Sequence, residues 1–153
     1  MQRSLAASRT RVVDASLAVW AVLPAVAVAG VDVLTELGVW RQSGIRLVAP
    51  VLWLAEATSA IRATVYTRQI SIEEGRVALR DMFDLPIETL QITAESCQAA
   101  FEWAARLQQA KAYDAFYLAV ADELNAEFWT ADRRLVNGAR QAGMARVHWI
   151  GDS

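Results

Sequence analysis

Short apolar segments alternate with longer helical ones along this chain, and that alternation restricts the fold more than any other feature. Five segments have the length and composition of strands: residues 11–14, 45–49, 87–92, 127–130 and 146–150. Strands separated by helices form parallel sheets, because each helical crossover returns the chain to the same edge. We therefore predict a three-layer α/β/α sandwich around a five-stranded, mainly parallel sheet.

The segments between these strands carry signals of helices. Residues 17–28 and 31–41 have helical character. Pro50 is expected to open the next helix, because the first helical position tolerates its missing N–H. Ser71 is followed three residues later by Glu74, which matches a capping box. Further helices are expected in residues 93–109, 112–125 and 132–142.

The length and composition of the chain fit one packed domain. It has 153 residues, of which 55% are hydrophobic and 21% charged, and it shows no repeat, low-complexity stretch or linker. We predict a single domain over residues 11–150, preceded by a mobile lead-in over residues 1–10.

An uncharged run over residues 15–31 follows several arginines and resembles a secretory signal peptide or a marginal membrane helix. Asp14 before the run, Pro24 within it and Asp32 after it favour a buried strand and a core-facing helix instead. Cys97 is the only cysteine, which excludes an intrachain disulfide and suits a reducing cytoplasm. We expect a cytoplasmic protein without a membrane segment.

Several classes of site find no support in the composition. His148 is the only histidine and has no second histidine or cysteine nearby, which disfavours a zinc site and a Ser-His-Asp hydrolase. The net charge of −2 provides no overall basic field for nucleic acid. An enzyme acting on nucleic acid would therefore have to meet phosphate through local arginines or through a metal ion.

Two acids lie at the ends of predicted strands. Asp14 ends the first strand, and Asp132 lies two residues beyond Thr130, where the fourth strand ends. Ligands of an open parallel sheet bind beyond the carboxyl ends of its strands, so both carboxylates belong to the functional edge. Each one alone is explained equally well as a helix cap at a strand-to-helix turn.

Two further acids lie in segments that are otherwise apolar. Glu56 is the only charged residue in residues 48–61, and Asp114 is the only one between Lys111 and Asp122. A carboxylate in apolar surroundings is costly unless a cation pairs with it or its pKa rises. No arginine is spaced to pair locally with Glu56, whereas Lys111 is within helical reach of Asp114, so an ordinary ion pair remains open there.

Four acids from separate segments fit one negative pocket for a hard divalent cation: Asp14, Glu56, Asp114 and Asp132. Mg²⁺ prefers oxygen ligands and is typically bound by a few carboxylates, waters and substrate phosphate. Such an ion, or Mn²⁺ in its place, activates a water and offsets charge on phosphoryl oxygens. This pattern does not by itself name a substrate.

Four segments together resemble one known family. They are VVDAS at residues 12–16, Ala49-Pro50 followed by Glu56, AYDAFYLA at residues 112–119 and TADRRL at residues 130–135. They resemble PIN-domain ribonucleases, and most closely the VapC-type toxins of bacterial toxin–antitoxin pairs. The resemblance runs from about residue 11 to residue 149. It implies a five-stranded α/β/α sandwich, metal-assisted endonucleolytic cleavage of RNA, homodimers, and inhibition by a partner antitoxin.

The resemblance also assigns roles to residues. It makes Asp14, Glu56, Asp114 and Asp132 the acidic metal-binding set. Ser16 and Thr130 fall where the family places a small hydroxyl that orients an acid or a metal-bound water, although each also reads as a plain turn hydroxyl. Arg133 and Arg134 are candidates to hold a substrate phosphate, or else solvated residues on a helix surface.

Some alternatives remain open and others do not. A haloacid-dehalogenase-type phosphatase needs an acid where Ser16 stands, and a P-loop or dinucleotide site needs a glycine-rich turn after the first strand. A catalytically silent PIN-fold binding or regulatory module and a housekeeping RNA-processing nuclease both remain possible.

The six tryptophans are expected in the core or in interfaces, and not as a platform for bases: Trp20, Trp40, Trp53, Trp103, Trp129 and Trp149. The apolar surplus of residues 17–37, with Trp40, is expected to contribute to a dimer or antitoxin contact.

Overall fold

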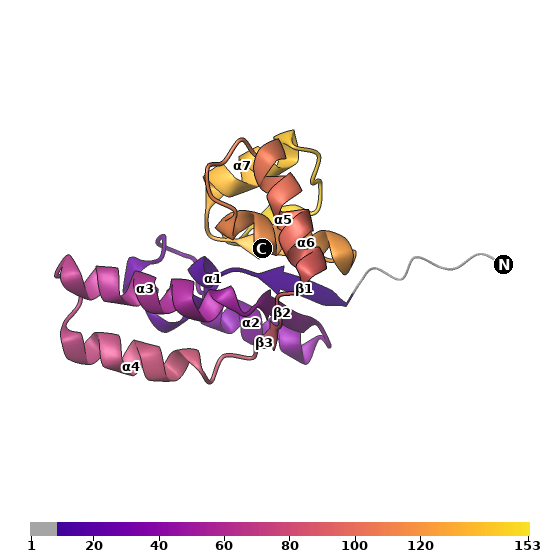
Figure 1. Ribbon diagram of the computed structural model, residues 1–153. Helices are drawn as coiled ribbons and strands as arrows, with labels where there is room; N and C mark the ends of the chain where they lie inside the picture. Colours follow the sequence, from indigo (N-terminus) through magenta and orange to yellow (C-terminus); the bar gives the residue numbers. More distant parts are fainter. Residues whose placement is uncertain (1–8) are drawn as a thin grey trace.

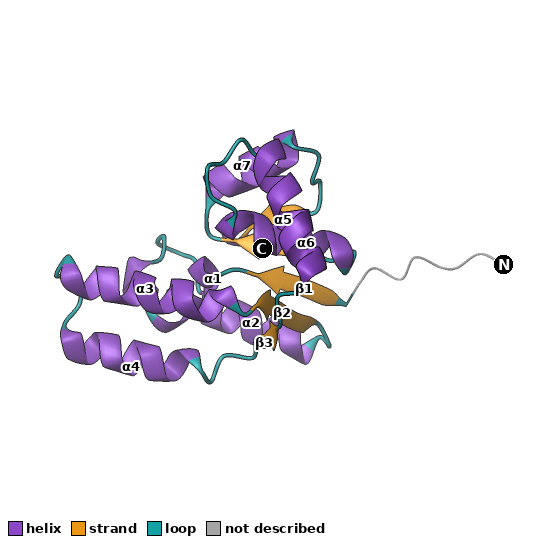
Figure 2. Cartoon of the chain, viewed as in Figure 1, coloured by secondary structure: helices purple, strands orange, loops and turns teal. Residues whose placement is uncertain are grey.

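The computed structural model describes residues 9–153, and five strands form one sheet with helices on both of its sides (Figures 1 and 2). The strands are β1 (Thr10–Val13), β2 (Arg46–Pro50), β3 (Glu88–Leu90), β4 (Glu127–Thr130) and β5 (Val147–Trp149). The helices are α1 (Ala15–Val22), α2 (Val33–Gln42), α3 (Leu52–Tyr66), α4 (Ile72–Met82), α5 (Ala94–Arg106), α6 (Tyr113–Glu123) and α7 (Arg133–Gln141), with 3₁₀ turns η1 (Pro24–Val26) and η2 (Ile150–Asp152).

All strand pairings are parallel, and the strand order is β3-β2-β1-β4-β5. The predicted five-stranded α/β/α architecture is therefore confirmed. β1 is central, and Val12 is in register with Val48 of β2 and Phe128 of β4. Of the predicted lead-in, residues 1–8 lie outside the described part of the chain, and β1 already begins at Thr10.

The two faces of the sheet are covered by different helices. Figure 1 shows α5, α6 and α7 gathered on one side of the sheet, with α1 to α4 on the other. Tyr117 of α6 stacks on Phe128, at 5.8 Å between ring centroids. Trp129, the next residue of β4, points to the opposite face, where Trp40 of α2 lies 4.9 Å from it.

Trp40 belongs to the core, which corrects the expectation that it forms a contact between proteins. Its exposed fraction is 4%, and the Arg11 guanidinium lies 4.4 Å from its ring centroid. Arg11 also stacks 4.9 Å from the Trp129 ring and pairs with Glu127 at 2.9 Å. The cation is thereby paired and shielded between two rings, which favours burial of the whole group. The other tryptophans are buried as well, with the exception of Trp20.

Two prolines mark where the structure departs from the predicted helices. The helix predicted for residues 17–28 ends at Val22, because Pro24 cannot donate a backbone hydrogen bond and restricts the residue before it. Pro50 does not open a helix but ends β2, where it is in register with Leu90. The Val51 N–H donates to the Leu90 carbonyl at 2.8 Å, which continues the sheet one residue further.

The capping box predicted at Ser71 is present. The Ser71 hydroxyl accepts from the Glu74 N–H at 3.1 Å, and the Glu74 carboxylate accepts from the Ser71 N–H at 2.6 Å. The helix that follows, α4, packs against α3 at Gly75. A Cβ atom at that position would lie 2.5 Å from Cγ2 of Val65, so the close approach of these helices requires glycine. Among the described helices, none combines the length and apolar character needed to cross a bilayer.

Candidate metal and active site

A cavity of about 350 Å³ opens beyond the carboxyl ends of the central strands, and all four predicted acids line it. Asp14 directly follows β1 and Asp132 lies between β4 and α7, while Glu56 is on α3 and Asp114 is in the first turn of α6. The remaining lining residues are Ala15, Ser16, Val19, Trp20, Ala60 and Tyr117. Four carboxylates that are distant in sequence therefore face one space.

Asp14 is the most enclosed of these acids, with an exposed fraction of 7%. It caps the N-terminus of α1, where Oδ1 accepts from the backbone N–H groups of Ser16 at 3.1 Å and Leu17 at 3.3 Å. Burial raises the pKa of Asp14 from 3.8 to about 6, against the lowering effect of its hydrogen bonds. The negative charge of Asp114 raises this pKa further.

Ser16 and Thr130 hold the Asp14 carboxylate from both sides. The Ser16 hydroxyl donates to Oδ1 of Asp14 at 2.5 Å and accepts from the Ala131 N–H at 2.9 Å. The Thr130 hydroxyl donates to Oδ2 of Asp14 at 2.5 Å and accepts from the Asp132 N–H at 3.0 Å. These two hydroxyls fix the orientation of Asp14 and join the end of β1 to the segment that carries Asp132.

Glu56 has an aromatic hydrogen-bond donor as its partner. The hydroxyl of Tyr117 donates to Oε1 of Glu56 at 2.5 Å. Partial burial raises the pKa of Glu56, the Tyr117 hydrogen bond lowers it, and the charge of Asp114 raises it again. Burial also raises the pKa of Tyr117, so this hydroxyl stays protonated and remains a donor.

Asp114 has no cation partner among the described residues, although Lys111 is spaced to reach it. Its Oδ2 accepts from Nε2 of Gln109 at 3.3 Å instead. Burial raises the pKa of Asp114, the Gln109 contact lowers it, and the charge of Asp132 raises it. The ion pair that the sequence left open for this acid is therefore absent from the structure.

Asp132 is exposed and caps α7, where its Oδ1 accepts from the backbone N–H groups of Arg134 at 2.9 Å and Leu135 at 3.3 Å. The arginine side chains that follow it do not reach an acid within residues 9–153. Arg133 instead places its guanidinium 3.6 Å from the ring centroid of Trp149. Both arginines line a hollow beside the acidic cavity.

The donor set of the cavity fits a hard cation. Its candidate ligands are carboxylate oxygens, and in the described part of the chain none of the four acids forms an ion pair with lysine, arginine or histidine. Burial, with a smaller effect of neighbouring carboxylates, raises the pKa values of Asp14, Glu56 and Asp114. A divalent ion would compensate the negative charges of these acids.

The acids line one cavity but are not already grouped as a finished ligand set. Across residues 9–153, no three acidic, histidine or cysteine side chains lie close enough together to hold an ion between them. Each carboxylate is held by its own hydrogen bonds. Mg²⁺ usually keeps several waters, so binding through one or two carboxylates and bridging waters is compatible with the arrangement.

Two cavity residues were missed by reasoning from the sequence. In the sequence, Tyr117 and Trp20 look like packing residues, because both lie in apolar helical segments. Tyr117 is buried, but its hydroxyl reaches the cavity, whereas Trp20 is only half-buried and lines the cavity wall. The spacing of Tyr117 three residues after Asp114, on the same helix face, is the one signal that could have identified it.

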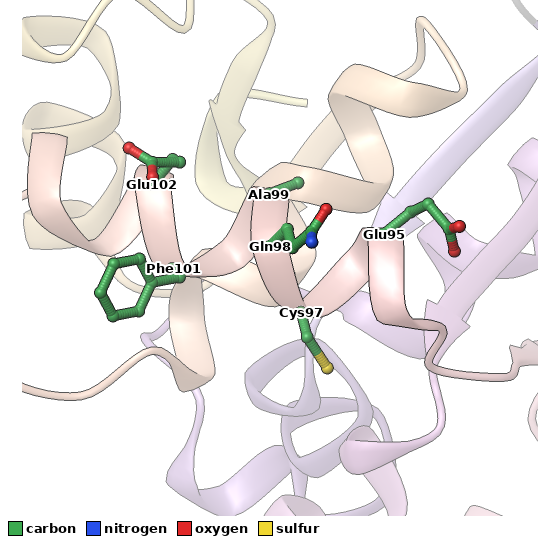
Figure 3. A pocket seen from close by; sticks show the side chains of 6 residues that line it. All are labelled: Glu95, Cys97, Gln98, Ala99, Phe101 and Glu102. Carbon is green, nitrogen blue, oxygen red and sulfur yellow. The ribbon is translucent and has the colours of Figure 1, made fainter.

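A larger and more open hollow of about 750 Å³ lies elsewhere, on α5 (Figure 3). Its six lining residues all come from that single helix and include none of the four acids: Glu95, Cys97, Gln98, Ala99, Phe101 and Glu102. Catalytic sites need side chains that converge from several elements. The smaller acidic cavity is therefore the candidate site, in spite of the larger volume on α5.

The fold and the cavity define an α/β/α protein with an acidic site at the carboxyl edge of its parallel sheet. The family model of the PIN domain matches residues 11–141, and the chain therefore belongs to the PIN domain family. The resemblance inferred from the sequence is confirmed at this level. No functionally curated protein gives a significant sequence match.

Solved structures share this fold at low sequence identity. PAE2754 of Pyrobaculum aerophilum has a TM-score of 0.66 and 19% identity, over 97% of this chain and 90% of that one. VapBC2 of Rickettsia felis, solved with a DNA fragment from its promoter, has a TM-score of 0.65 and 13% identity, over 92% and 98%. VapC20 of Mycobacterium tuberculosis, described as a toxin that cleaves the sarcin–ricin loop, has a TM-score of 0.56 and 19% identity, over 89% and 98%.

Proposed function

We propose that this chain is a divalent-metal-dependent endoribonuclease and the toxin of a toxin–antitoxin pair. The observation that carries the proposal is the meeting of four carboxylates from separate elements at one cavity, with no cationic side chain paired to them within residues 9–153. Membership of the PIN domain family supports a nuclease. Mg²⁺ is the expected ion, and Mn²⁺ is expected to substitute for it.

Asp14, Glu56, Asp114 and Asp132 are the residues that would hold the ion. When bound, a divalent ion activates water and stabilises charge on the phosphoryl oxygens of the substrate. The chain contributes orientation: Ser16 and Thr130 hold Asp14, and Tyr117 holds Glu56. Arg133 and Arg134, beside the cavity, are the candidate contacts to substrate phosphate.

The proposed toxin role carries two partner predictions. VapC20 is described as a toxin that cleaves the sarcin–ricin loop, and VapBC2 was solved with promoter DNA, which supports a cognate antitoxin for this chain. We also expect a homodimer. Coexpression with the product of the neighbouring reading frame, followed by size-exclusion chromatography with light scattering, tests both expectations. A monomer that binds no product of an adjacent gene would contradict them.

The nuclease is tested by incubating purified chain with mixed RNA in Mg²⁺ or Mn²⁺, with and without a chelator. We expect cleavage that the chelator abolishes and that Asp14→Asn reduces by at least about a hundredfold, in the range for loss of a central charge-stabilising group. Asp84→Asn, which changes an exposed aspartate outside the cavity in the same way, should cleave normally.

The contrary outcomes separate the alternatives. If wild type and Asp14→Asn degrade RNA equally, the activity belongs to a contaminant and the proposal fails. If neither degrades RNA with any divalent ion, a catalytically silent PIN-fold module is favoured. Growth arrest on expression, relieved by Asp14→Asn, would distinguish a toxin from a housekeeping nuclease.

A further inference from the structure

A second hollow of about 500 Å³ continues directly from the acidic cavity. The two spaces share Ser16, Trp20 and Asp132 as lining residues and are therefore contiguous. Beyond these shared residues the second hollow carries Arg133 and Trp149. We call this space the Trp20–Arg133 groove.

The Arg133 side chain is held in a defined orientation. Its guanidinium lies 3.6 Å from the Trp149 ring centroid, and Nε1 of Trp149 donates to the Ala131 carbonyl at 3.2 Å. Gly151 packs so closely that a Cβ there would lie 2.0 Å from the Trp149 ring. The ring is therefore fixed beneath the guanidinium.

Stacking occupies the face of the Arg133 guanidinium and leaves its N–H edge available. No carboxylate of the described residues lies within ion-pair distance of it. A guanidinium edge presents parallel donors that match two oxygens of a phosphate. The groove thus offers a preoriented anion contact next to four carboxylates that would themselves repel a phosphate without a cation.

Trp20 offers a different kind of surface. It lies on α1 at the junction of cavity and groove and is half-buried, unlike the five other tryptophans. In the described part of the chain, no aromatic ring or cation stacks on it. Trp20 packs against the core but stays partly exposed, and a partly exposed indole beside a phosphate contact is suited to stacking on an unpaired nucleobase.

We propose that the Trp20–Arg133 groove is a nucleotide subsite for single-stranded RNA, adjacent to the phosphodiester in the acidic cavity. Trp20 stacks on the base, Arg133 binds that nucleotide's phosphate, and Trp149 positions Arg133. The inference rests on the proposed nuclease for the placement of the scissile bond.

Binding, and not cleavage, gives the sharpest test. Fluorescence anisotropy measures the affinity of Asp14→Asn protein, in Mg²⁺, for a labelled single-stranded RNA and for a series with one abasic nucleotide moved along the strand. Adding Trp20→Ala should weaken binding of the intact RNA by about 5- to 100-fold. At one position, the abasic nucleotide should weaken binding only when Trp20 is present.

The same design addresses Arg133 with a series that carries one uncharged methylphosphonate linkage. Arg133→Ala should weaken binding and abolish the sensitivity to one linkage. Trp149→Leu should also weaken binding and abolish the sensitivity to that linkage, in protein whose melting temperature shows that it is folded. Trp149→Phe keeps a ring beneath the guanidinium and should restore both the affinity and the sensitivity to that linkage. A purely structural role of Trp149 would weaken binding equally for every linkage.

Matched controls come from α5, outside both spaces. Arg106 stacks 3.9 Å from the Trp103 centroid but lines neither space, and Phe101 is 72% exposed on α5. Arg106→Ala and Phe101→Ala should leave RNA affinity unchanged.

The subsite is wrong if Trp20→Ala and Arg133→Ala bind like these controls, or if no single-stranded RNA binds at all. Position-specific binding without cleavage by wild type would retain the subsite and reject the nuclease. Metal-dependent cleavage by wild type, together with unaltered RNA binding by Trp20→Ala and Arg133→Ala, would retain the nuclease and reject the subsite.

Discussion

The hydroxyl of Tyr117 donates a 2.5 Å hydrogen bond to Oε1 of Glu56, which joins α6 to α3 at the acidic cavity. Tyr117 is 1% exposed and its ring is stacked on Phe128 of the central sheet. The rigid core therefore extends through one hydroxyl to a candidate metal ligand. Glu56 owes its orientation to a residue that looks like simple core packing in the sequence.

Tyr117→Phe removes this hydrogen bond and keeps the ring. We expect the free energy of unfolding to fall by about 1 kcal/mol, the typical net value of such a bond. The pKa of Glu56 should rise, since the lost contact lowers it. RNA cleavage should require more Mg²⁺, measured as the half-saturating concentration. Tyr66→Phe removes a hydroxyl from a 76% exposed side chain and should change none of these quantities. Identical Mg²⁺ dependence in Tyr117→Phe and wild type would contradict a ligand role for Glu56.

Stability of the metal-free protein should depend on pH through Asp14. Its pKa is about 6 in the folded state and 3.8 as the ordinary value, so the folded state binds this proton more tightly. The free energy of unfolding should therefore decrease as pH rises from about 4 to about 6, by up to about 3 kcal/mol from this group. Denaturant unfolding in a chelator across this range measures it.

Asp14→Asn should flatten that part of the pH profile, whereas Asp84→Asn should retain it. Above pH 6, Mg²⁺ should restore stability to wild type and have little effect on Asp14→Asn, because a ligand that binds only the folded state stabilises it. A wild-type profile that rises with pH over this interval would show that Asp14 is not the dominant buried acid.

Thr130→Val replaces a hydroxyl by a methyl group of similar size at a position with 0% exposure. It removes the 2.5 Å donor to Asp14 and the 3.0 Å acceptor for the Asp132 N–H. We expect metal affinity or the rate of cleavage to fall about 10- to 100-fold, which is the usual effect of losing a residue that orients a metal ligand. Because the Thr130 hydrogen bond lowers the pKa of Asp14, the pH midpoint of cleavage should move upward. Thr130→Ser keeps the hydroxyl and should recover most of the lost metal affinity or cleavage and most of the shift in the pH midpoint. Equal defects in Thr130→Val and Thr130→Ser would point to a packing effect instead.

Gly75→Ala should act on stability alone. The added Cβ meets Cγ2 of Val65 at 2.5 Å, and valine has little rotamer freedom in a helix to move away. We expect a loss of about 1–3 kcal/mol, measured by denaturant unfolding. Gly138→Ala is the matched control: its Cβ would meet Leu107 at 3.9 Å, and alanine should stabilise α7 by up to about 1 kcal/mol. Equal effects of the two substitutions would refute the close α3–α4 contact.

The positions of the five strands were accessible from the sequence because each is a short apolar segment between helical ones. Their order was not, since periodicity does not encode which strands become neighbours. Pro50 was misassigned because proline suits both a helix start and the last position of a strand, and pairing with β3 decides between them. The four acids could be singled out because a lone carboxylate in an apolar segment demands an explanation. Trp20 gave no signal and Tyr117 only its spacing from Asp114, because an aromatic side chain in an apolar helix normally indicates core.

The central position of β1 has a consequence for when activity can begin. Asp14 is hydrogen-bonded to Thr130, a residue synthesised 116 positions later, and Asp132 follows still later. A polypeptide that has been translated only through α6 lacks both, and the carboxylate of Asp14 then has neither its threonine donor nor the last of the four acids beside it. If the chain is the proposed ribonuclease, a growing polypeptide cannot damage RNA around the ribosome that makes it until β4 has inserted beside β1.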